Sequence, residues 1–235
     1  MVVRMDYLNY GKENQSLIPT TSTVGIIANK EPFPHLIVED FYDEKELELI
    51  WEELNFYTKP GKLLEAKDYG GVKDRTNAKA LALDLIYLNL ENRSSNGINY
   101  RNISNILTVN RKLFTSNILN EYAKLHECCN LKYDTDITKI RYYHNGEYYN
   151  PHKDYRYQTL IFSYFYKEPK KFSGGELFFP NHNYEYSCNN NSLIIFPAWV
   201  EHGVREVKIK DSDYYDGHGR YAITSFLFAP DFIQP

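Results

Sequence analysis

The spacing of hydrophobic and polar positions changes near residue 135. After it, short apolar stretches alternate with segments rich in Gly, Pro and Asn, as in β-strands joined by turns. Many short strands with turns between them predict a mainly β protein with two sheets or a closed sheet, such as a jelly roll. The expected strands are Thr138–Tyr143, Gln158–Tyr166, Glu176–Phe179, Ser192–Phe196 and Arg220–Phe228.

The N-terminal half contains helical spacing instead. Residues 43–54 place Leu47, Ile50 and Leu54 on one face, with acidic residues in the first turn, so we expect a helix there. A second helical region is expected from about Ile103 to Glu127. Residues 32–38 predict a short strand that begins after a proline turn.

This pattern predicts how the chain is organised. Residues 1–30 are polar and mixed, and we expect either an N-terminal arm or a first edge strand. Residues 31–235 are expected to form a single domain, with helical support over about 40–130 and a β core over about 135–230. Residues 58–80 carry Pro, Gly and charged side chains, so they predict a loop that is long enough to be a lid.

Composition narrows the class of protein. Tyr accounts for 22 residues, which favours strands, and the formal net charge is -4 with no long basic run. Nucleic acid is therefore not an expected partner, although a local basic patch would be compatible with the sequence. No apolar signal core or long apolar stretch occurs, so we expect a cytoplasmic protein without a membrane partner.

Cysteine usage bears on the metal chemistry. The chain has three cysteines, two of which are the adjacent Cys128 and Cys129, and it has no Cys-x-x-Cys pair. An odd number of cysteines is a poor disulfide framework, and the spacing does not predict a zinc site with thiolate ligands.

A histidine and an aspartate two residues apart form the first candidate site. In an extended segment, His152 and Asp154 point to the same side and can reach one metal ion together. Two histidines and one carboxylate on one face of a metal are typical of non-haem Fe(II) oxygenases, because they leave coordination positions open. A surface turn after Asn150-Pro151 is the alternative explanation of the tripeptide.

His202 is the candidate for the third ligand. It follows the strongly apolar segment 192–200, so the end of a buried strand can hold it rigidly. The alternative is a core histidine that donates to a backbone carbonyl.

Arg220 begins an alternating aromatic segment and shares one face with Ala222, Thr224 and Phe226. An arginine on an inward face needs an anion, because an unpaired buried charge is costly. Its planar fork suits the distal carboxylate of a keto acid, with the Thr224 hydroxyl as a further candidate contact. A structural salt bridge to an internal acid is the alternative.

Four segments in this order resemble the prolyl 4-hydroxylase-type members of the Fe(II)- and 2-oxoglutarate-dependent oxygenase superfamily. Arg141–Asp154 resembles the iron-binding segment of that family, and residues 196–204 resemble its distal-histidine segment. The Gly-Gly-Glu-Leu turn of residues 173–180 and the Gly219–Ile223 segment are similar to two further family motifs. The resemblance covers about residues 135–230.

The resemblance implies a double-stranded β-helix, a jelly roll of the cupin-like kind. It implies Fe(II) and O2 as cofactors, 2-oxoglutarate as co-substrate, and hydroxylation of a C–H bond with release of succinate and CO2. It implies catalytic metal ligation by His152, Asp154 and His202, and 2-oxoglutarate binding by Arg220. It also implies that Tyr143 contacts the keto acid, with the adjacent Tyr142 as the alternative.

The spacing between His202 and Arg220 is longer than is usual in that family. Residues 205–219 intervene, and we expect an extended hairpin there. The rival hypothesis is that Lys210 binds the carboxylate and that Arg220 is structural.

The subgroup implies a peptide or protein substrate, most simply a peptidyl proline. Within the enzyme class, the alternative is a free amino acid or another small molecule. Outside it, the alternative is a binding module that has the metal ligands but no turnover.

Overall fold

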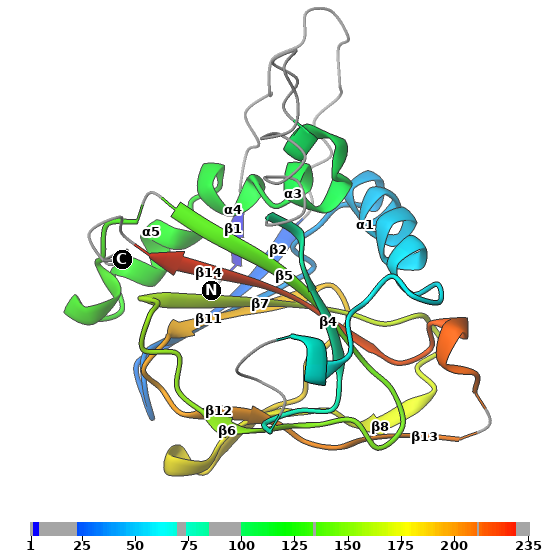
Figure 1. Ribbon diagram of the computed structural model, residues 1–235. Helices are drawn as coiled ribbons and strands as arrows, with labels where there is room; N and C mark the ends of the chain where they lie inside the picture. Colours follow the sequence, from blue (N-terminus) through cyan, green and yellow to red (C-terminus); the bar gives the residue numbers. More distant parts are fainter. Residues whose placement is uncertain are drawn as a thin grey trace, which may run out of the picture.

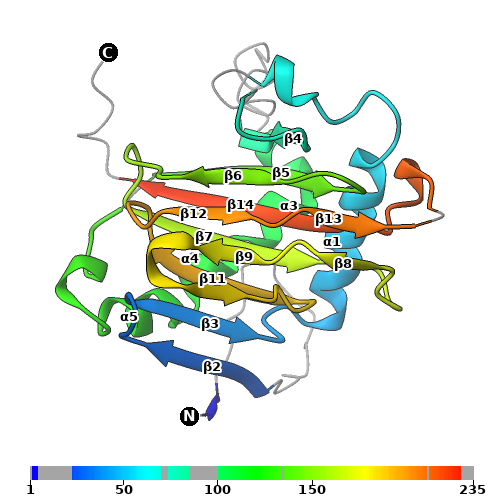
Figure 2. The same ribbon diagram turned by 90° about the horizontal axis from the view of Figure 1, so that it is seen from below.

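Two β layers face each other, and helices cover the outer face of the larger one, which is a single sheet (Figure 1). The computed structural model describes residues 2–4, 23–69, 74–84, 100–133, 135–210 and 212–228. Seen from below, the strands of the smaller layer lie in front of the larger sheet (Figure 2). The mainly β class predicted from the sequence is confirmed.

The larger sheet has the strand order β1-β2-β3-β11-β7-β14-β5-β4 among the described residues. All of its pairings are antiparallel. Its strands are β1 (Val2–Arg4), β2 (Thr23–Asn29), β3 (His35–Glu39), β4 (Lys79–Ala82), β5 (Thr135–Tyr143), β7 (Thr159–Phe165), β11 (Ser192–Pro197) and β14 (Arg220–Phe228).

The smaller layer consists of a sheet ordered β10-β9-β12-β6 and a two-stranded sheet of β13 and β8, within the described ranges. Its strands are short because turns and bulges interrupt them. They are β6 (Tyr149–His152), β8 (Phe172–Gly174), β9 (Leu177–Phe179), β10 (Tyr184–Tyr186), β12 (His202–Val204) and β13 (Val207–Ile209).

The chain alternates between the two layers from β5 onward. From β5 the chain crosses to β6, returns to β7, crosses to β8, β9 and β10, returns to β11, crosses to β12 and β13, and returns to β14. This alternation is the connectivity of a double-stranded β-helix, so the jelly-roll fold that the resemblance implied is confirmed by the strand topology.

Each large-sheet strand that the sequence predicted is present; β14 has the predicted ends, and the other strands are shifted at one or both ends. The predicted strand over 138–143 begins at Thr135, and the one over 158–166 is β7. The strand expected over 32–38 is β3, which begins only at His35. Within residues 1–30, the described residues 2–4 and 23–29 form β1 and β2, with β1 at the edge of the sheet and β2 between β1 and β3.

One helix supports the sheet as predicted. Helix α1 (Glu44–Tyr57) begins at the N-cap Asp43, whose side chain accepts from the Glu46 N–H in a capping box. The Glu53 carboxylate accepts from Ser104 Oγ and from the Ile106 N–H, so it joins α1 to α3 (Asn105–Val109).

The expectation of one helical region over 103–127 is wrong in its continuity. Asn110 ends α3, and Ser116 ends the next helix in an extended conformation, so the region breaks into separate turns. Polar residues that compete for backbone hydrogen bonds explain the breaks. The pieces are η2 (Tyr100–Ile103), α3, α4 (Lys112–Thr115), α5 (Ile118–Ala123) and η3 (Glu127–Cys129).

The expected hairpin over 205–219 is also wrong. Residues 207–209 form β13, which pairs with β8 and not with a neighbour in the insertion. Val207 and Ile209 are buried and Lys208 is exposed. Pairing with β8 places residues 207–209 in the smaller layer, where both apolar side chains face the core. The 3-10 turn η5 (Tyr214–Asp216) then leads to β14.

The segment 58–80 is less of a loop than expected. It contains the 3-10 turn η1 (Ala66–Asp68) and the start of β4, while residues 70–73 lie outside the described part. Thr76 forms an isolated bridge with Tyr149, which holds residues 74–77 against β6.

The large sheet separates two cores. One packs under the helices and includes Leu36, Ile50 and Tyr142. The other lies between the layers and includes Tyr143, Phe162 and Phe196. Because side chains alternate along a strand, β3, β5, β7, β11 and β14 each contribute to both cores, and the inner face of β5 and β14 is the floor of the space between the layers.

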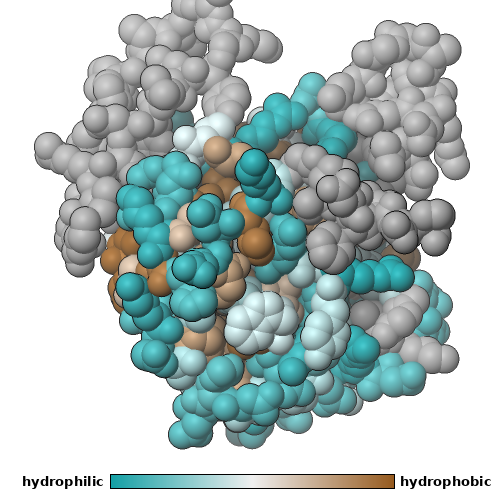
Figure 3. Space-filling view, turned by 90° about the vertical axis from the view of Figure 1, so that its left-hand side faces the viewer, coloured by the Kyte–Doolittle hydropathy of each residue, from teal (hydrophilic) through white to brown (hydrophobic). Residues whose placement is uncertain are grey.

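The described surface seen in Figure 3 is mostly hydrophilic, with a group of hydrophobic residues near the middle of that face. Within the described part of the chain, none of the helices has the length and apolar character that crossing a membrane requires.

Candidate active site

Two histidines meet across paired strands of the smaller layer. His202 is the register partner of His152 in the β12–β6 pair, and the two ring centroids are 4.4 Å apart. The Asp154 backbone N–H donates to the Ala198 carbonyl at 3.0 Å, which fixes the chain just after β6. The sequence predicted His152 and Asp154 in an extended segment, but not that His202 begins a strand of its own.

The three predicted ligands converge. One ligand atom from each of His152, Asp154 and His202 lies within 4.8 Å of the others. Asp154 Oδ2 is 3.7 Å from His152 Nε2 and 3.8 Å from His202 Nε2. These separations suit side chains that share a metal ion better than side chains that hydrogen-bond to one another.

Backbone carbonyls orient both imidazoles. His152 Nδ1 is 3.0 Å from the Asn150 carbonyl, and His202 Nδ1 is 2.9 Å from the Val200 carbonyl. A carbonyl can only accept, so Nδ1 carries the proton and Nε2 keeps its lone pair. His202 Nε2 is buried and has no hydrogen-bond partner among the described residues.

The surroundings keep both rings neutral. Burial, followed by the nearby His202 ring, lowers the pKa of His152 to about 3. Burial also lowers the pKa of His202. A neutral imidazole is the form that coordinates a metal, so this donor set fits Fe(II): two neutral nitrogens and one carboxylate, with positions left for further ligands.

A partly buried carboxyl supports the turn that leads into β6. Glu147 accepts from the His144 N–H at 2.6 Å, and burial raises its pKa to about 7. A folded-state pKa above the unfolded value means that ionisation destabilises the fold. The contribution of Glu147 to the free energy of unfolding is therefore most favourable at low pH, and it becomes less favourable as the pH rises from about 4.5 to about 7.

Glu147→Gln should therefore stabilise the protein more at pH 8 than at pH 4, because glutamine still accepts the hydrogen bond but cannot ionise. The expected gain at pH 8 is on the order of 1–3 kcal/mol, measured by urea unfolding at both pH values. Glu48→Gln on the exposed face of α1 is the control for loss of a surface charge. An equal gain at both pH values would contradict the assignment.

Arg220 is enclosed opposite the three ligands. Its side chain is almost completely buried, at 1% exposure, and its Nε and Nη1 have no hydrogen-bond partner in the described structure. The guanidinium lies 4.9 Å from the Tyr143 ring centroid and 4.7 Å from that of Tyr164. No described acidic residue forms a salt bridge with it, so the internal salt bridge considered from the sequence is not observed.

The free donors of Arg220 indicate an anion that no described residue supplies. Among the described contacts, Nη2 donates to Cys188 Sγ at 3.4 Å. The side chain packs on Gly175, where a Cβ would lie 2.9 Å from Arg220 Cδ. The Gly-Gly turn therefore leaves room for the arginine, which explains physically why that turn accompanies it.

The geometry distinguishes Tyr143 from Tyr142. Tyr143 lines the pocket with Arg220, whereas Tyr142 faces the helix-side core, where its hydroxyl accepts from the Gly219 N–H. Thr224 also lines the pocket, but it lies four residues from Arg220 along β14 and opposite Lys139. That is about 13 Å along a strand, so one carboxylate does not span both residues.

The rival residue Lys210 is exposed and is not among the residues that line the pocket. The geometry therefore favours Arg220 over Lys210 as the anion-binding residue.

The sequence model of the 2OG-Fe(II) oxygenase superfamily matches residues 138–228, which include all of these candidate side chains. These residues belong to the 2OG-Fe(II) oxygenase superfamily. The match confirms the resemblance seen in the sequence and the enzyme class, a 2-oxoglutarate-dependent dioxygenase. It also implies the expected cofactors Fe(II), 2-oxoglutarate and O2, and the three converging ligands are a candidate site for the iron.

Solved structures of other oxygenases are similar at low identity. A Pseudomonas putida prolyl-4-hydroxylase is 14% identical, with 83% of this chain and 92% of that chain covered and a TM-score of 0.48. The viral collagen prolyl hydroxylase of Paramecium Bursaria Chlorella virus-1 is 14% identical, with 83% and 96% covered and a TM-score of 0.46.

A Burkholderia pseudomallei oxidoreductase of the 2OG-Fe(II) oxygenase family is 13% identical, with 82% and 84% covered and a TM-score of 0.48. At this identity and TM-score, none of these likenesses bears on the substrate. A comparison with curated protein sequences finds no significant match.

Sequence reasoning missed two cations in the oxygenase pocket. Arg141 and Lys139 precede Tyr143 at intervals of two on β5, and all three side chains line the pocket. The alternation that placed Arg220, Ala222 and Thr224 on one face would have placed them too. Arg75 also lines the pocket, from the segment beside β6, and no sequence signal pointed to it.

Proposed function

We propose that this oxygenase hydroxylates a proline residue in a peptide or protein, with Fe(II) held by His152, Asp154 and His202. The observation that carries the metal assignment is the convergence of one buried and two partly buried ligands within 4.8 Å. When bound, Fe(II) with 2-oxoglutarate and O2 supplies the oxidising chemistry that hydroxylates a C–H bond as the keto acid becomes succinate and CO2.

The protein's own residues bind and orient the reactants. In the proposal, the Arg220 fork pairs with the distal carboxylate of 2-oxoglutarate, and Tyr143 lies against the same end of the co-substrate. The backbone carbonyls of Asn150 and Val200 hold the two imidazoles in the metal-binding tautomer. The aromatic walls, including Phe162 and Tyr149, exclude water from the space between the layers.

The peptidyl-proline assignment is supported by the order and spacing of the four sequence motifs. The segment from Arg141 to Asp154 supplies β5, the turn and β6, and the segment from Phe196 to Val204 supplies the strand end and β12. Both segments meet at the candidate metal site in the arrangement that the prolyl-hydroxylase resemblance implies. A small-molecule substrate is the second candidate, and the cations that line the pocket favour it.

The test is formation of succinate from 2-oxoglutarate with Fe(II) and O2, with and without a panel of proline-containing peptides. We expect slow turnover without substrate, and an increase of at least about tenfold with a suitable peptide, together with a mass gain of one oxygen in that peptide. Bound keto acid with no succinate under any condition would favour the binding-module alternative. Succinate formation that only non-proline compounds stimulate would overturn the proline assignment alone.

A further inference from the structure

The pocket has more positive charge than metal and co-substrate binding require. Among its described lining residues are four cations, Arg75, Lys139, Arg141 and Arg220, and one carboxylate, Asp154. Fe(II) and doubly charged 2-oxoglutarate cancel one another, so the excess of cations persists when both are bound. Arg75 is exposed and Lys139 is partly buried, whereas Arg141 and Arg220 are buried, and a buried excess of one sign is costly without a counter-ion.

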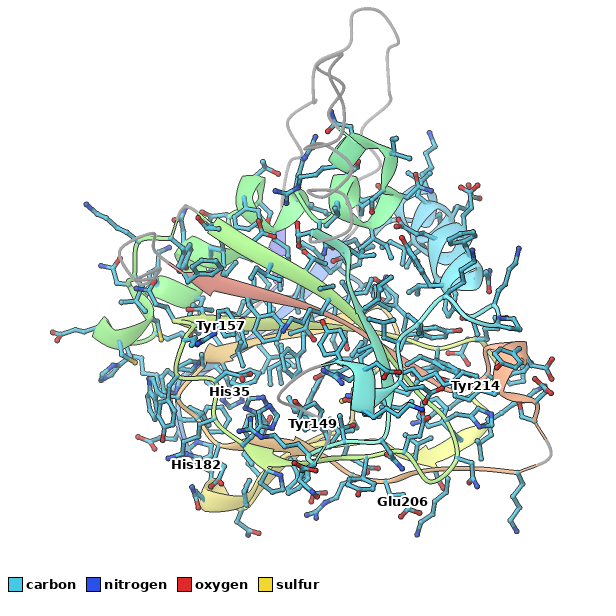
Figure 4. All side chains as sticks on the ribbon, viewed as in Figure 1. His35, Tyr149, Tyr157, His182, Glu206 and Tyr214 are labelled. Carbon is cyan, nitrogen blue, oxygen red and sulfur yellow. The ribbon has the colours of Figure 1, made fainter. Side chains whose placement is uncertain are left out.

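After Arg220, Arg141 is the most buried of these four cations. It is 9% exposed, its Nη1 has no hydrogen-bond partner, and no described acidic side chain forms a salt bridge with it. Its guanidinium lies 4.7 Å from the Tyr149 ring centroid, and the Tyr149 ring stacks on that of His152 at 4.2 Å. Arg141 is therefore close to the candidate metal ligands. Figure 4 places Tyr149 between the two layers.

Lys139 extends the same row of side chains. Its Nζ lies 4.4 Å from the Phe226 ring centroid, and no described acid pairs with it. Burial, and then the charge of Arg141, lower the pKa of Lys139 to about 8, and the charge of Asp154 only partly opposes this shift.

The register separates these two cations from the proposed co-substrate end. Arg220 lies opposite Tyr143, whereas Arg141 lies opposite Ala222 and Lys139 opposite Thr224. Successive inward positions are about 7 Å apart along a strand. The anion that Arg220 binds is thus at one end of the row, and Arg141 and Lys139 face the rest of the pocket.

We propose that the substrate of this oxygenase carries a carboxylate, bound by Arg141 and Lys139, close to the carbon that is hydroxylated. The inference rests on the proposed function, since it assigns the substrate class of the same site. Two sources share this chemistry: the α-carboxylate of a free or C-terminal proline, and the side chain of an acidic residue next to an internal proline. The planar fork of Arg141 suits either carboxylate, and Lys139 adds a second donor.

Matched pairs of ligands test the inference. N-acetylproline is compared with N-acetylprolinamide, and an internal-proline peptide with a neighbouring Asp is compared with the same peptide carrying Asn. Binding to the protein loaded with Mn(II) and 2-oxoglutarate is measured by calorimetry, and hydroxylation with Fe(II) is measured by mass spectrometry. We expect the acid of at least one pair to bind about tenfold to a hundredfold more tightly than its neutral partner. Which pair responds identifies the source.

Variants assign the effect to these side chains. In Arg141→Gln, the carboxylate and the amide of the responding pair should bind with about equal affinity, while the Kd for 2-oxoglutarate stays within about twofold of its original value. Arg141→Lys should keep part of the preference for the carboxylate. Lys208→Gln, which removes an exposed charge on β13, should keep all of it. Lys139→Gln provides the same test at a partly buried position if thermal unfolding shows that Arg141→Gln does not fold.

Three outcomes overturn the inference. They are equal binding within both pairs, no binding by any carboxylate, and an Arg141→Gln variant that weakens 2-oxoglutarate binding but leaves the ratio unchanged. The last outcome would assign Arg141 to the co-substrate. A third pair, N-acetylalanine and its amide, separates this test from the proposed function. If only the proline assignment is wrong, N-acetylalanine still binds more tightly than its amide, this difference is lost in Arg141→Gln, and no proline is hydroxylated.

Discussion

Replacing His152, Asp154 or His202 with alanine is expected to abolish Fe(II)-dependent formation of succinate from 2-oxoglutarate. Each side chain supplies one corner of a three-ligand face, and a face with two ligands holds the ion weakly and in the wrong geometry. Loss of a residue that merely orients a ligand costs about 10- to 100-fold, so loss of a ligand should cost at least about 100-fold.

The measurement pairs succinate formation with anaerobic titration of Mn(II) or Co(II), so that metal binding is followed separately from turnover. His182→Ala is the matched control, because His182 lies against Phe33 outside the pocket. Full activity in any one of the three variants would remove that residue from the ligand set. A tightly held zinc with thiolate ligands would implicate the cysteines instead.

Arg220→Ala is expected to raise the 2-oxoglutarate requirement by roughly tenfold to a hundredfold. The guanidinium is buried and has two nitrogens without partners, so the co-substrate carboxylate would gain charge-assisted hydrogen bonds worth about 1.5–3 kcal/mol. Arg220→Lys should restore part of the affinity, because a point charge cannot reproduce the planar fork. Titration of 2-oxoglutarate in the succinate assay measures both effects.

Metal binding should survive both Arg220 substitutions, since none of the proposed ligands changes. Lys210→Ala, at an exposed position in the segment 205–219 that precedes Arg220, is the control and should leave the 2-oxoglutarate requirement nearly unchanged. The reverse result, with Lys210 sensitive and Arg220 insensitive, would move the co-substrate site to Lys210.

The large sheet could be predicted from the sequence because its strands are long and apolar. β7, β11 and β14 have buried positions on both faces, so each stands out as a segment of mostly apolar residues. Their ends were less predictable. β5 begins at Thr135, three residues earlier than its apolar run, because pairing with Phe228 of β14 extends it.

Most of the smaller layer could not be predicted in the same way. β12 is only three residues long, and β6 contains Pro151 and the polar residues Asn150 and His152. Such strands have no hydrophobic periodicity, and their position is specified by pairing with neighbouring strands that are distant in sequence. That tertiary pairing also explains why β13 joins β8 and does not form a local hairpin.

The candidate ligands were predictable because their chemistry restricts residue type and spacing. The His152–Asp154 tripeptide has the residue types and spacing of a metal site. The arginine at the start of β14 lies on an inward face, where its charge requires an anion. Arg141 and Lys139 were missed because a cation in a strand is ordinarily assigned to the solvent face. Their inward direction follows only from the alternation that Tyr143 sets and from the layer that covers them.

The position of Arg220 also bears on which keto acid can be used. β14 is hydrogen-bonded to β5 on one side and to β7 on the other, so the base of Arg220 is fixed in the large sheet. The two histidines belong to the opposite layer, and facing sheets pack about 10 Å apart. The span from guanidinium to metal ligands is therefore set by the thickness of the sandwich and not by a movable loop. With the distal carboxylate on Arg220, as proposed, a keto acid one carbon shorter or longer is expected to bind more weakly, because the backbone sets the separation of the two ends.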